Sequence, residues 1–383
     1  MNTVAASIPV LRWAAERARL TDSQLQRCFP KWPLWLTGEV QPTLRQLEDF
    51  ARLTHTPFGL FFLPQPPAIT LPVPDFRTMR DEAPREPSSD LLDTLYLCQM
   101  RQEWYREHSL MHGLPSLPFV GSSSLHEKPS EVASRMRDVL GLSTEQRVKL
   151  STWTDALRQM ISKADDAGIL VMVSSVVGSN SHRKLDVAEF RGFALVDELA
   201  PLIFLNGADS KAAQMFTLAH EMAHIWLGAA GISDPQPGQV PNQETERWCN
   251  QVAAALLMPI EELRATYRPD APLPEEIQRL AREFKVSTLV ALRRLFDAGF
   301  ITQVELWQHY QEEQGRLRRL EERSGSGGDF YRSLSARASK RFTRAIVAST
   351  LEGLTSFTEA FRLLGIRKTA TFYEAARELG VTA

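Results

Sequence analysis

The sequence has few cysteines and no long apolar run. Its three cysteines, Cys28, Cys98 and Cys249, lie far apart and form no CxxC pair, which argues against the disulfide framework of small secreted domains. The most apolar stretch, residues 168–177, is too short to cross a bilayer. Charged residues also interrupt the N-terminus before the apolar core of a signal peptide could form. We therefore expect a cytoplasmic protein without a membrane partner.

Neither sign of charge is in excess. The chain has 44 lysines and arginines against 46 aspartates and glutamates, which leaves a net charge of -2. The protein therefore has no net positive electrostatic field that would attract nucleic acid, and any binding to DNA would have to come from a local group of charges. Hydrophobic residues make up 43% of the 383 residues. This composition is typical of a folded chain, and the length indicates two or three domains.

The pattern of apolar residues places a mixed α+β region between two helical ones. Strand signals cluster in the middle of the chain, where runs of Val, Ile and Phe end at turn residues. Segments with helical spacing surround them. The predicted elements are five short helices within 9–62, helices at 88–113, 129–142 and 155–167, strands at 169–177, 190–196 and 201–206, helices at 209–227 and 244–257, further helices within 274–314, and a helical tail at 331–380.

The strongest chemical signal is the HExxH sequence that contains His220, Glu221 and His224. Inside a helix the two histidines lie one turn apart on one face, where their imidazoles can bind the same Zn²⁺. The glutamate beside them is placed to act as a general base. Ordinary polar residues on an amphipathic helix are the alternative. The preceding strand, the apolar opposite face and a cap at Asp209 or Ser210 favour the metal site.

A catalytic zinc site needs a third protein ligand, and we predict Glu246 at the start of the following helix. Asn250 lies one turn later on the same face, where it can hydrogen-bond a ligand. Glu244 and Asp234 are rival third ligands. Glu246 could instead be an acid that merely suits the N-terminus of a helix, and Cys249 could close a structural site with four ligands.

Two segments resemble the ImmA/IrrE family of zinc metallopeptidases: FTLAHEMAHIWLG at 216–228 and ETERWCNQVAAALLMP at 244–259. Residues 71–78 and 186–214 resemble longer members of that family, which carry an N-terminal helix-turn-helix domain of the Xre type. The resemblance covers most of residues 9–300. It implies an α+β fold with an all-α helix-turn-helix domain, a zincin-like metallopeptidase domain with a small sheet, and a helical C-terminal region.

The resemblance also assigns roles to individual residues. It implies that zinc is bound by His220, His224 and Glu246, and that Glu221 is the general base. The family motif contains a glutamate and an asparagine that this chain keeps as Glu246 and Asn250. Cys249 and Val252 replace an alanine and a phenylalanine of that motif, so the chain departs from the family pattern around the third ligand.

Composition and resemblance together predict the domain boundaries. A proline-rich stretch and the sequence SGSGG are typical of connectors between folded parts. The expected segments are an Xre-type helix-turn-helix domain (1–63), a Pro-rich connector (64–86), a zincin-like metallopeptidase domain (87–268), a helical extension (269–323), a Gly/Ser linker (324–329) and a helical C-terminal module (330–383).

The activity of the family implies a zinc endopeptidase that cleaves a helix-turn-helix repressor or regulatory protein. Such cleavage releases stress, mobile-element or phage genes. The sequence leaves open whether the site is active, latent until a signal frees it, or vestigial. An extended substrate could add a strand beside residues 202–206. The other hypothesis is a non-catalytic DNA-binding regulator, or an antitoxin-like protein that holds a toxin partner through its helical modules. The sequence does not separate the two, and it predicts neither an oligomeric state nor an oxyanion-stabilising residue.

DNA contacts of the N-terminal domain are expected within residues 30–37, where a second helix would present Lys31, Trp32 and Trp35. Two prolines and two tryptophans are poor base-reading residues, and residues 9–62 carry seven basic against five acidic side chains. DNA binding is as open as its alternative, a protein-docking or purely structural module with a short apolar surface. The tail adds basic residues that are expected along one solvated helix face: Arg332, Arg337, Lys340, Arg341 and Arg344.

Overall fold

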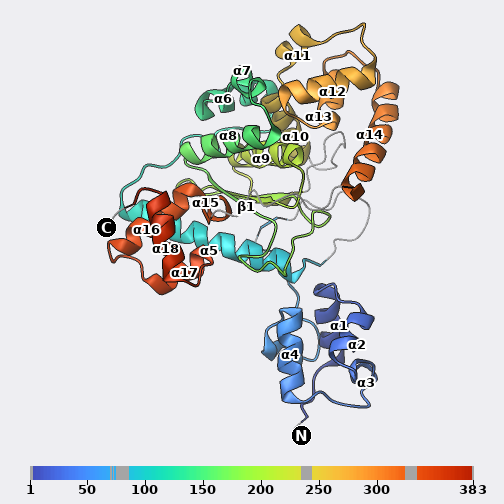
Figure 1. The fold of residues 1–383 in the computed structure, drawn as a ribbon, viewed down its shortest axis with the longest axis vertical. Helices are drawn as coiled ribbons and strands as arrows, with labels where there is room; N and C mark the ends of the chain where they lie inside the picture. Colours follow the sequence, from blue (N-terminus) through green and yellow to red (C-terminus); the bar gives the residue numbers. More distant parts are fainter. Residues whose placement is uncertain are drawn as a thin grey trace. The chain divides into compact units, whose positions relative to one another are not determined.

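The computed structural model describes residues 3–69, 71, 73–74, 86–233, 244–323 and 334–381. The chain divides into two compact units. One is formed by Met1–Pro72 and Ala83–Tyr96, and the other by Val73–Glu82 and Leu97–Ala383. The first unit is helical, whereas the second combines helices with a small sheet of four strands (Figure 1). The mixture of helix and sheet predicted from the sequence is therefore present.

In its described residues the first unit contains, besides the beginning of a longer helix that continues into the second unit, four α-helices and one 3-10 helix: α1 (Ile8–Arg17), α2 (Asp22–Cys28), α3 (Trp32–Thr37), α4 (Leu44–Thr54) and η1 (Phe58–Phe62). Thr21 and Thr43 cap α2 and α4, and each forms a reciprocal capping box with a glutamine three residues later. These caps explain why the breaks between helices could be predicted. The fifth predicted helix is the short 3-10 turn η1.

Residues 30–37 do not present their two tryptophans at the surface, although Pro30, Pro33 and Leu34 of this segment are exposed. Trp32 and Trp35 are 1% and 2% exposed, because α3 turns both rings into the core against Phe50, whose ring centroid lies 5.3 and 6.3 Å away. The Trp32 indole donates a hydrogen bond to Asp22 Oδ1 (2.9 Å). The prediction that these two rings contact DNA is therefore wrong. Lys31, by contrast, is exposed.

The sheet of the second unit has the order β1-β3-β2-β4. Its strands are β1 (Leu170–Ser174), β2 (Gly192–Leu195), β3 (Leu202–Asn206) and β4 (Gly231–Ser233). β3 pairs in parallel with β1 and antiparallel with β2, and β4 pairs antiparallel with β2. Because β3 has a hydrogen-bonded strand on each side, it cannot accept an added substrate strand. The expectation that residues 202–206 bind substrate in this way is wrong.

The other helices, of which α5 contributes to both units, are α5 (Ser89–Met111), α6 (Pro129–Leu140), α7 (Thr144–Val148), α8 (Trp153–Asp166), α9 (Lys211–Leu227), α10 (Glu244–Leu257), α11 (Ile260–Thr266), α12 (Leu273–Phe284), α13 (Thr288–Asp297), α14 (Gln303–Arg323), α15 (Leu334–Ala338), α16 (Lys340–Leu351), α17 (Phe357–Leu364) and α18 (Thr369–Glu378). None of the helices in the described ranges combines the length and the apolar character that a membrane span requires.

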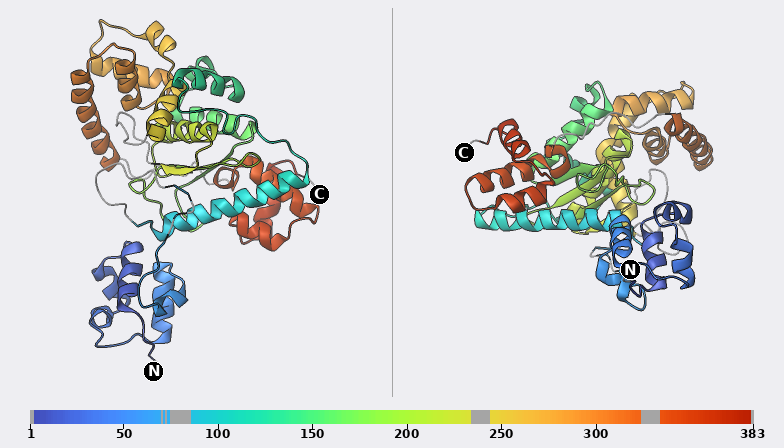
Figure 2. Two further views of the ribbon diagram at one scale, coloured as in Figure 1. Left: turned by 180° about the vertical axis from the view of Figure 1, so that it is seen from behind. Right: turned by 60° about the horizontal axis from the view of Figure 1, so that its bottom comes forward.

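Helices cover both faces of the sheet (Figures 1 and 2). α8 and α9 pack on one face, where Val171, Ala194 and Ile203 belong to the same core as these helices. α5 and α15 lie on the opposite face. There Gln102 of α5 donates hydrogen bonds to the carbonyl oxygens of Leu195 and the nearby loop (both 2.9 Å), and α15 packs on β1. The helix with the HExxH sequence, α9, is thus an inner element of a three-layered unit.

Three short elements of the second unit were not predicted: α7, β4 and α11. They have five, three and seven residues, too few to produce a periodic pattern.

The C-terminal tail also differs from the prediction of one basic helix face. Its basic residues in the described part of the chain, Arg337, Lys340, Arg341 and Arg344, lie on two helices, because Ser339, with φ 63°, interrupts the helical backbone between α15 and α16. Arg341 and Arg344 donate to backbone carbonyls within the unit, and Arg332 and the 324–329 linker lie outside the described residues.

Three arginines hold the C-terminal end of α10; Arg147 and Arg294 are buried and Arg137 is half-buried. Arg137 of α6 donates to the carbonyl oxygen of Ala255 (2.9 Å), Arg294 of α13 donates to that of Met258 (2.8 Å), and Arg147 of α7 donates to that of Leu257. These carbonyls have no partner within the helix, and cations suit the negative end of its dipole. Burial lowers the pKa of Arg147 to about 10, so this guanidinium keeps its charge at neutral pH.

Replacing Arg147 by methionine is expected to lower the free energy of unfolding by about 2 kcal/mol, because the buried end of α10 loses a charged donor. Urea unfolding measures the difference. Arg158→Met on α8 is the control, since that side chain is 59% exposed and its ion pair contributes little. Equal stability of the two variants would contradict the role given to Arg147.

Candidate metal centre

α9 is enclosed on all sides. Ser210 caps its N-terminus by accepting a hydrogen bond from the Ala213 N–H (3.3 Å), and Gly228 ends it in the left-handed conformation with φ 75°. Residues 214–226 are all buried. The sequence predicts an amphipathic helix, but this helix lies between the sheet, α8 and α10, so both its faces are covered. The polar residues of HExxH therefore lie in the interior.

Three of the predicted site residues come together in this interior. His220 and His224 extend from α9, and Glu246 extends from the first turn of α10. The two Nε2 atoms are 3.0 Å apart, Glu246 Oε2 lies 3.3 Å from His220 Nε2, and Glu246 Oε1 lies 3.0 Å from His224 Nε2. All three side chains are 0% exposed. The structure thus forms one compact donor set from two helices.

This donor set fits a metal cation. Asn250 Oδ1 lies 2.9 Å from His220 Nδ1, so Nδ1 carries the proton and donates it, which leaves a lone pair on Nε2. That lone pair, His224 Nε2 and the carboxylate of Glu246 meet in a site closed to water. Electron-pair donors so close together repel one another unless a cation lies between them. Two imidazoles with one carboxylate are a ligand set of catalytic zinc sites.

The protonation states agree with this chemistry. Burial by itself raises the pKa of Glu246, but the neighbouring imidazoles of His220 and His224 outweigh it and hold that pKa at about 2. Burial lowers the pKa of His224 below its ordinary value, more than the adjacent carboxylate of Glu246 raises it. At neutral pH the site therefore offers an ionised carboxylate and a neutral ring, which are the forms that bind metals.

Glu221 follows His220 directly but is not one of the converging donors. Its carboxylate is 0% exposed and lies beside β2, since a Cβ placed on Gly192 would be 3.4 Å from Glu221 Oε1. One carboxylate, Glu246, thus joins the donor set, whereas the other stays next to it. A metal hydrolase needs this division, because one acid binds the ion and another must exchange protons.

Comparison with known proteins bears on the same region. Residues 164–296 match the family model of the IrrE N-terminal-like domain. The radiation response metalloprotease IrrE of Deinococcus radiodurans is 35% identical over 99 residues, which cover 24% of this chain and 30% of that protein. The protein of the same name from Deinococcus deserti is 35% identical over 99 residues, which cover 24% of this chain and 35% of that protein. These matches support the ImmA/IrrE family.

The IrrE-like domain, residues 164–296, includes the five site residues described above: His220, Glu221, His224, Glu246 and Asn250. Its family is one of metallopeptidases, which implies a metal cofactor, typically zinc. The chain spans about a third of the length of the Deinococcus relatives. Residues 338–378, which contain α16 to α18, match a domain of unknown function (DUF8813). Neither family match includes residues 1–63, so a helix-turn-helix identity of that segment stays a prediction.

The rival ligands of the IrrE-like domain lie elsewhere. Glu244 is exposed on the first turn of α10, and Asp234 lies outside the described residues. Cys249 is buried, and its burial together with the carboxylates of Glu246 and Glu221 raises the pKa of its thiol well above the usual value, which favours the neutral form over the metal-binding thiolate. Sequence reasoning missed Gly192, because only the pairing of β2 with its neighbours brings it to α9.

Asn250 is expected to strengthen metal binding without touching the ion. Its oxygen fixes the tautomer and the orientation of the His220 ring, and partners of this kind are worth about 10-fold to 100-fold in metal affinity. We therefore expect Asn250→Ala to weaken zinc binding by about that factor, measured by competition with a chelating dye. Gln251→Ala is the control, since its side chain is the exposed neighbour on the same helix. Equal affinities would contradict this role.

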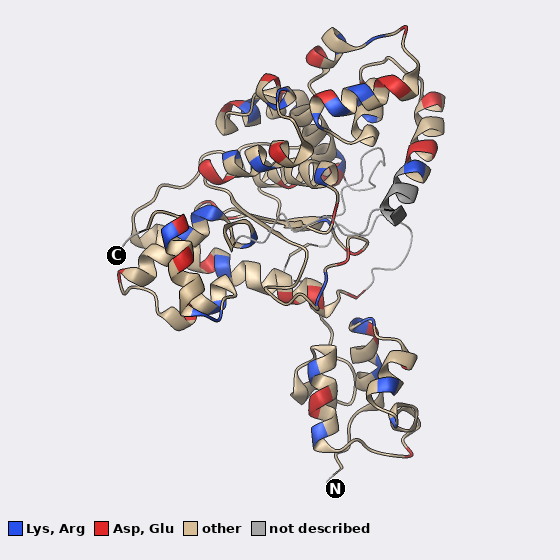
Figure 3. Ribbon diagram, viewed as in Figure 1, with Lys and Arg blue, Asp and Glu red and all other residues tan. Residues whose placement is uncertain are grey.

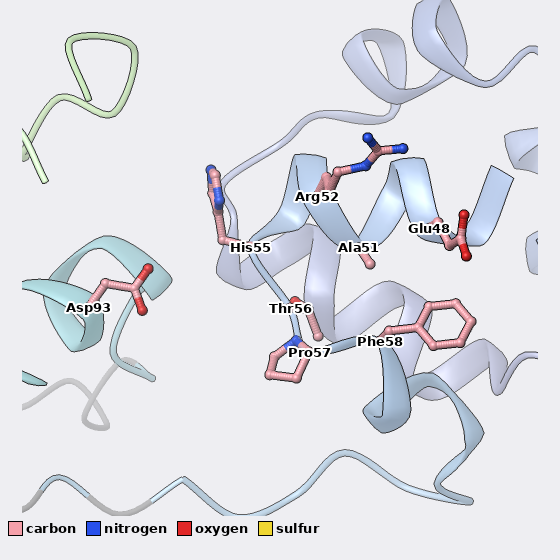
Figure 4. A pocket seen from close by; sticks show the side chains of 8 residues that line it. All are labelled: Glu48, Ala51, Arg52, His55, Thr56, Pro57, Phe58 and Asp93. Atoms are coloured by element: carbon pink, nitrogen blue, oxygen red, sulfur yellow. The ribbon is translucent and has the colours of Figure 1, made fainter. Parts of the chain in front are cut away.

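The first unit carries a pocket of about 710 Å³ (Figure 4), and it is chemically different from the metal centre. Its lining residues come from α4, η1, the segment between them and the start of α5: Glu48, Ala51, Arg52, His55, Thr56, Pro57, Phe58 and Asp93. One guanidinium, one imidazole and two carboxylates do not favour a ligand of either sign. Basic and acidic side chains are likewise interspersed over the helices of this unit (Figure 3).

Proposed function

We propose that this chain is a zinc-dependent endopeptidase of the ImmA/IrrE type that cleaves a helix-turn-helix repressor or regulatory protein and so controls stress, mobile-element or phage genes. The observation that carries the proposal is the buried convergence of His220, His224 and Glu246, with Glu221 beside them on α9. The match of residues 164–296 to the IrrE N-terminal-like domain supports the same class of activity.

In this proposal His220, His224 and Glu246 hold the zinc ion and Asn250 orients the first imidazole. The ion, when bound, supplies Lewis acidity at the scissile peptide group. Glu221 accepts a proton at its carboxylate from the attacking water molecule. It then returns this proton to the nitrogen of the leaving peptide, so one residue serves as base and then as acid. The closed surroundings exclude bulk water and strengthen each of these electrostatic interactions.

We also propose that the activity is latent. The side chains of His220, Glu221, His224 and Glu246 are all 0% exposed, so a protein substrate reaches them only after the chain around the site moves. A peptidase built in this way has a low basal rate and cleaves few proteins. The restricted access suits limited cleavage of one regulatory protein better than general protein degradation.

The test is chelator-sensitive cleavage. The purified chain is incubated with candidate helix-turn-helix repressors from the same organism, and fragments are identified by mass spectrometry. We expect a single cleavage that stops when zinc is removed by a chelator and resumes when zinc is added back. Cleavage that continues in the chelator would point to a contaminating peptidase. A repressor that binds the chain equally well with and without zinc, and is never cut, would favour the non-catalytic binding protein.

The role proposed for the first unit needs a separate measurement. DNA binding, if this unit provides it, must come from local charges such as Lys31, because α3 buries both of its tryptophans. Gel-shift titrations at low and moderate salt distinguish phosphate-dominated binding, which weakens steeply as salt rises, from docking onto a repressor or a toxin partner.

A further inference from the structure

Gly192 is the first residue of β2 and faces the HExxH helix. It pairs with Leu205 of β3 on one side and with Ser233 of β4 on the other. Alternation along the strand places Gly192 and Ala194 on the face toward α9 and Phe193 on the opposite face, where its ring stacks on Phe204 at 5.1 Å between centroids. No side chain therefore separates the start of β2 from α9.

The space at Gly192 admits no side chain. An ideal Cβ there would lie 2.6 Å from Thr217 Cγ2, 2.9 Å from the carbonyl oxygen of Phe204 and 3.4 Å from Glu221 Oε1. The carbonyl belongs to β3 and is held by the sheet, so it cannot turn away as a flexible side chain could. Gly192 is not among the glycines with positive φ. Glycine is therefore required here for close approach and not for backbone conformation.

Thr217 forms the other side of this contact. It lies one turn before Glu221 on α9, so the two side chains share one face of the helix. Thr217 is 1% exposed, and within the described part of the chain its hydroxyl has no hydrogen-bond partner. Burial of the hydroxyl is thus not compensated by a hydrogen bond, whereas the methyl group lies in the space that a side chain at position 192 would occupy. The shape of Thr217 matters at this position.

We propose that Gly192 and Thr217 are positioning residues that set the place of the Glu221 carboxylate, an inference that rests on the proposed peptidase function. The backbone of β2 and the methyl group of Thr217 bound the space beside the carboxylate. A general base must reach its proton within hydrogen-bond distance, and a misplacement of about 1 Å can lower a rate by about 100-fold. The converging ligand atoms belong to His220, His224 and Glu246, so we expect metal binding to be independent of Gly192 and Thr217.

The deciding experiment shifts one methyl group from the helix side to the strand side of the contact between Thr217 and Gly192. Gly192→Ala adds a methyl group on the strand, and Thr217→Ala removes one from the helix. The double variant does both and keeps the number of methyl groups constant. Gly315→Ala on α14 is the control for a glycine replacement, because nothing lies within 4 Å of a Cβ at that position. Zinc content, crystal structures of the zinc-loaded proteins, kcat and KM are measured for each full-length chain.

We expect Gly192→Ala to lower kcat by about 100-fold and Thr217→Ala by about 10-fold, with KM changed by less than about threefold. The double variant is expected to exceed Gly192→Ala in kcat, whereas independent effects would multiply to about 1,000-fold below the original. Recovery stays incomplete, because the Phe204 carbonyl still crowds the new methyl group. Gly315→Ala keeps the original kcat, and all four variants keep about one zinc per chain.

Two readouts keep this inference separate from the peptidase assignment. If the original chain binds zinc but cleaves no repressor, the proposed function fails. The crystal structures still test whether Gly192 and Thr217 set the place of the Glu221 carboxylate. That carboxylate should be displaced in Gly192→Ala and should return to its original place in the double variant. If Gly192→Ala does not fold, Thr217→Ala and the double variant carry the comparison. The inference would be overturned by an unmoved carboxylate in these variants, by losses of kcat that multiply in the double variant, or by a loss of zinc in parallel with kcat.

Discussion

Replacing Glu221 by glutamine is expected to lower kcat for repressor cleavage by about 1,000-fold while zinc stays at about one per chain. Glutamine has nearly the same size and shape, so the enclosed helix α9 keeps its packing. Its amide cannot accept the proton that the attacking water must lose. The metal donors are untouched, because the converging atoms belong to His220, His224 and Glu246. The two measurements are steady-state cleavage and elemental analysis of the same preparation.

The control for this replacement is Glu145→Gln, which makes the same chemical change at an exposed side chain of α7 that pairs with Lys149. It should leave both zinc content and kcat unchanged. A Glu221→Gln chain that still cleaves would exclude this residue as the proton acceptor. A chain that loses zinc would instead mean that Glu221 supports the metal centre, and the division of roles between the two carboxylates would be wrong.

Local signals explain what the sequence predicts well. Thr21 and Thr43 cap helices because their hydroxyls and the following glutamines satisfy backbone groups within four residues. α10 begins and ends where its predicted range of 244–257 does, since its apolar spacing is regular up to Pro259. The grouping of the two histidines follows from helical geometry alone. In each case the interacting atoms lie close together in the sequence.

Features that depend on distant pairing could not be predicted in the same way. Gly192 meets α9 only because β2 pairs between β3 and β4, and a strand as short as β4 has no pattern of its own. The direction in which Trp32 and Trp35 point depends on packing against Phe50, which follows them by 15 to 18 residues. Burial of α9 on both faces likewise requires α8 and α10. Each of these three features depends on tertiary contacts between residues that are distant in the sequence.

Loss of Glu246 is expected to remove the metal almost completely. With Glu246→Ala the two imidazoles lose the only carboxylate ligand of the donor set, and a buried cation without its anionic ligand is strongly disfavoured. We expect zinc to fall from about one per chain to below about 0.1 after dialysis, as in His220→Ala and His224→Ala. Glu244→Ala is the matched control, because this exposed acid lies two residues earlier on the same helix.

Thermal unfolding provides the second measurement, because a ligand that binds only the folded chain stabilises it by mass action. Zinc at about 1,000 times its dissociation constant adds about 4 kcal/mol to the free energy of unfolding. The original chain and Glu244→Ala should therefore melt at a higher temperature with zinc than without it, whereas Glu246→Ala should show no such shift. If Glu244→Ala lost the metal and Glu246→Ala kept it, the third ligand would be the exposed acid. The buried contacts of Glu246 with both histidines would then be only structural, and the peptidase mechanism built on them would fail.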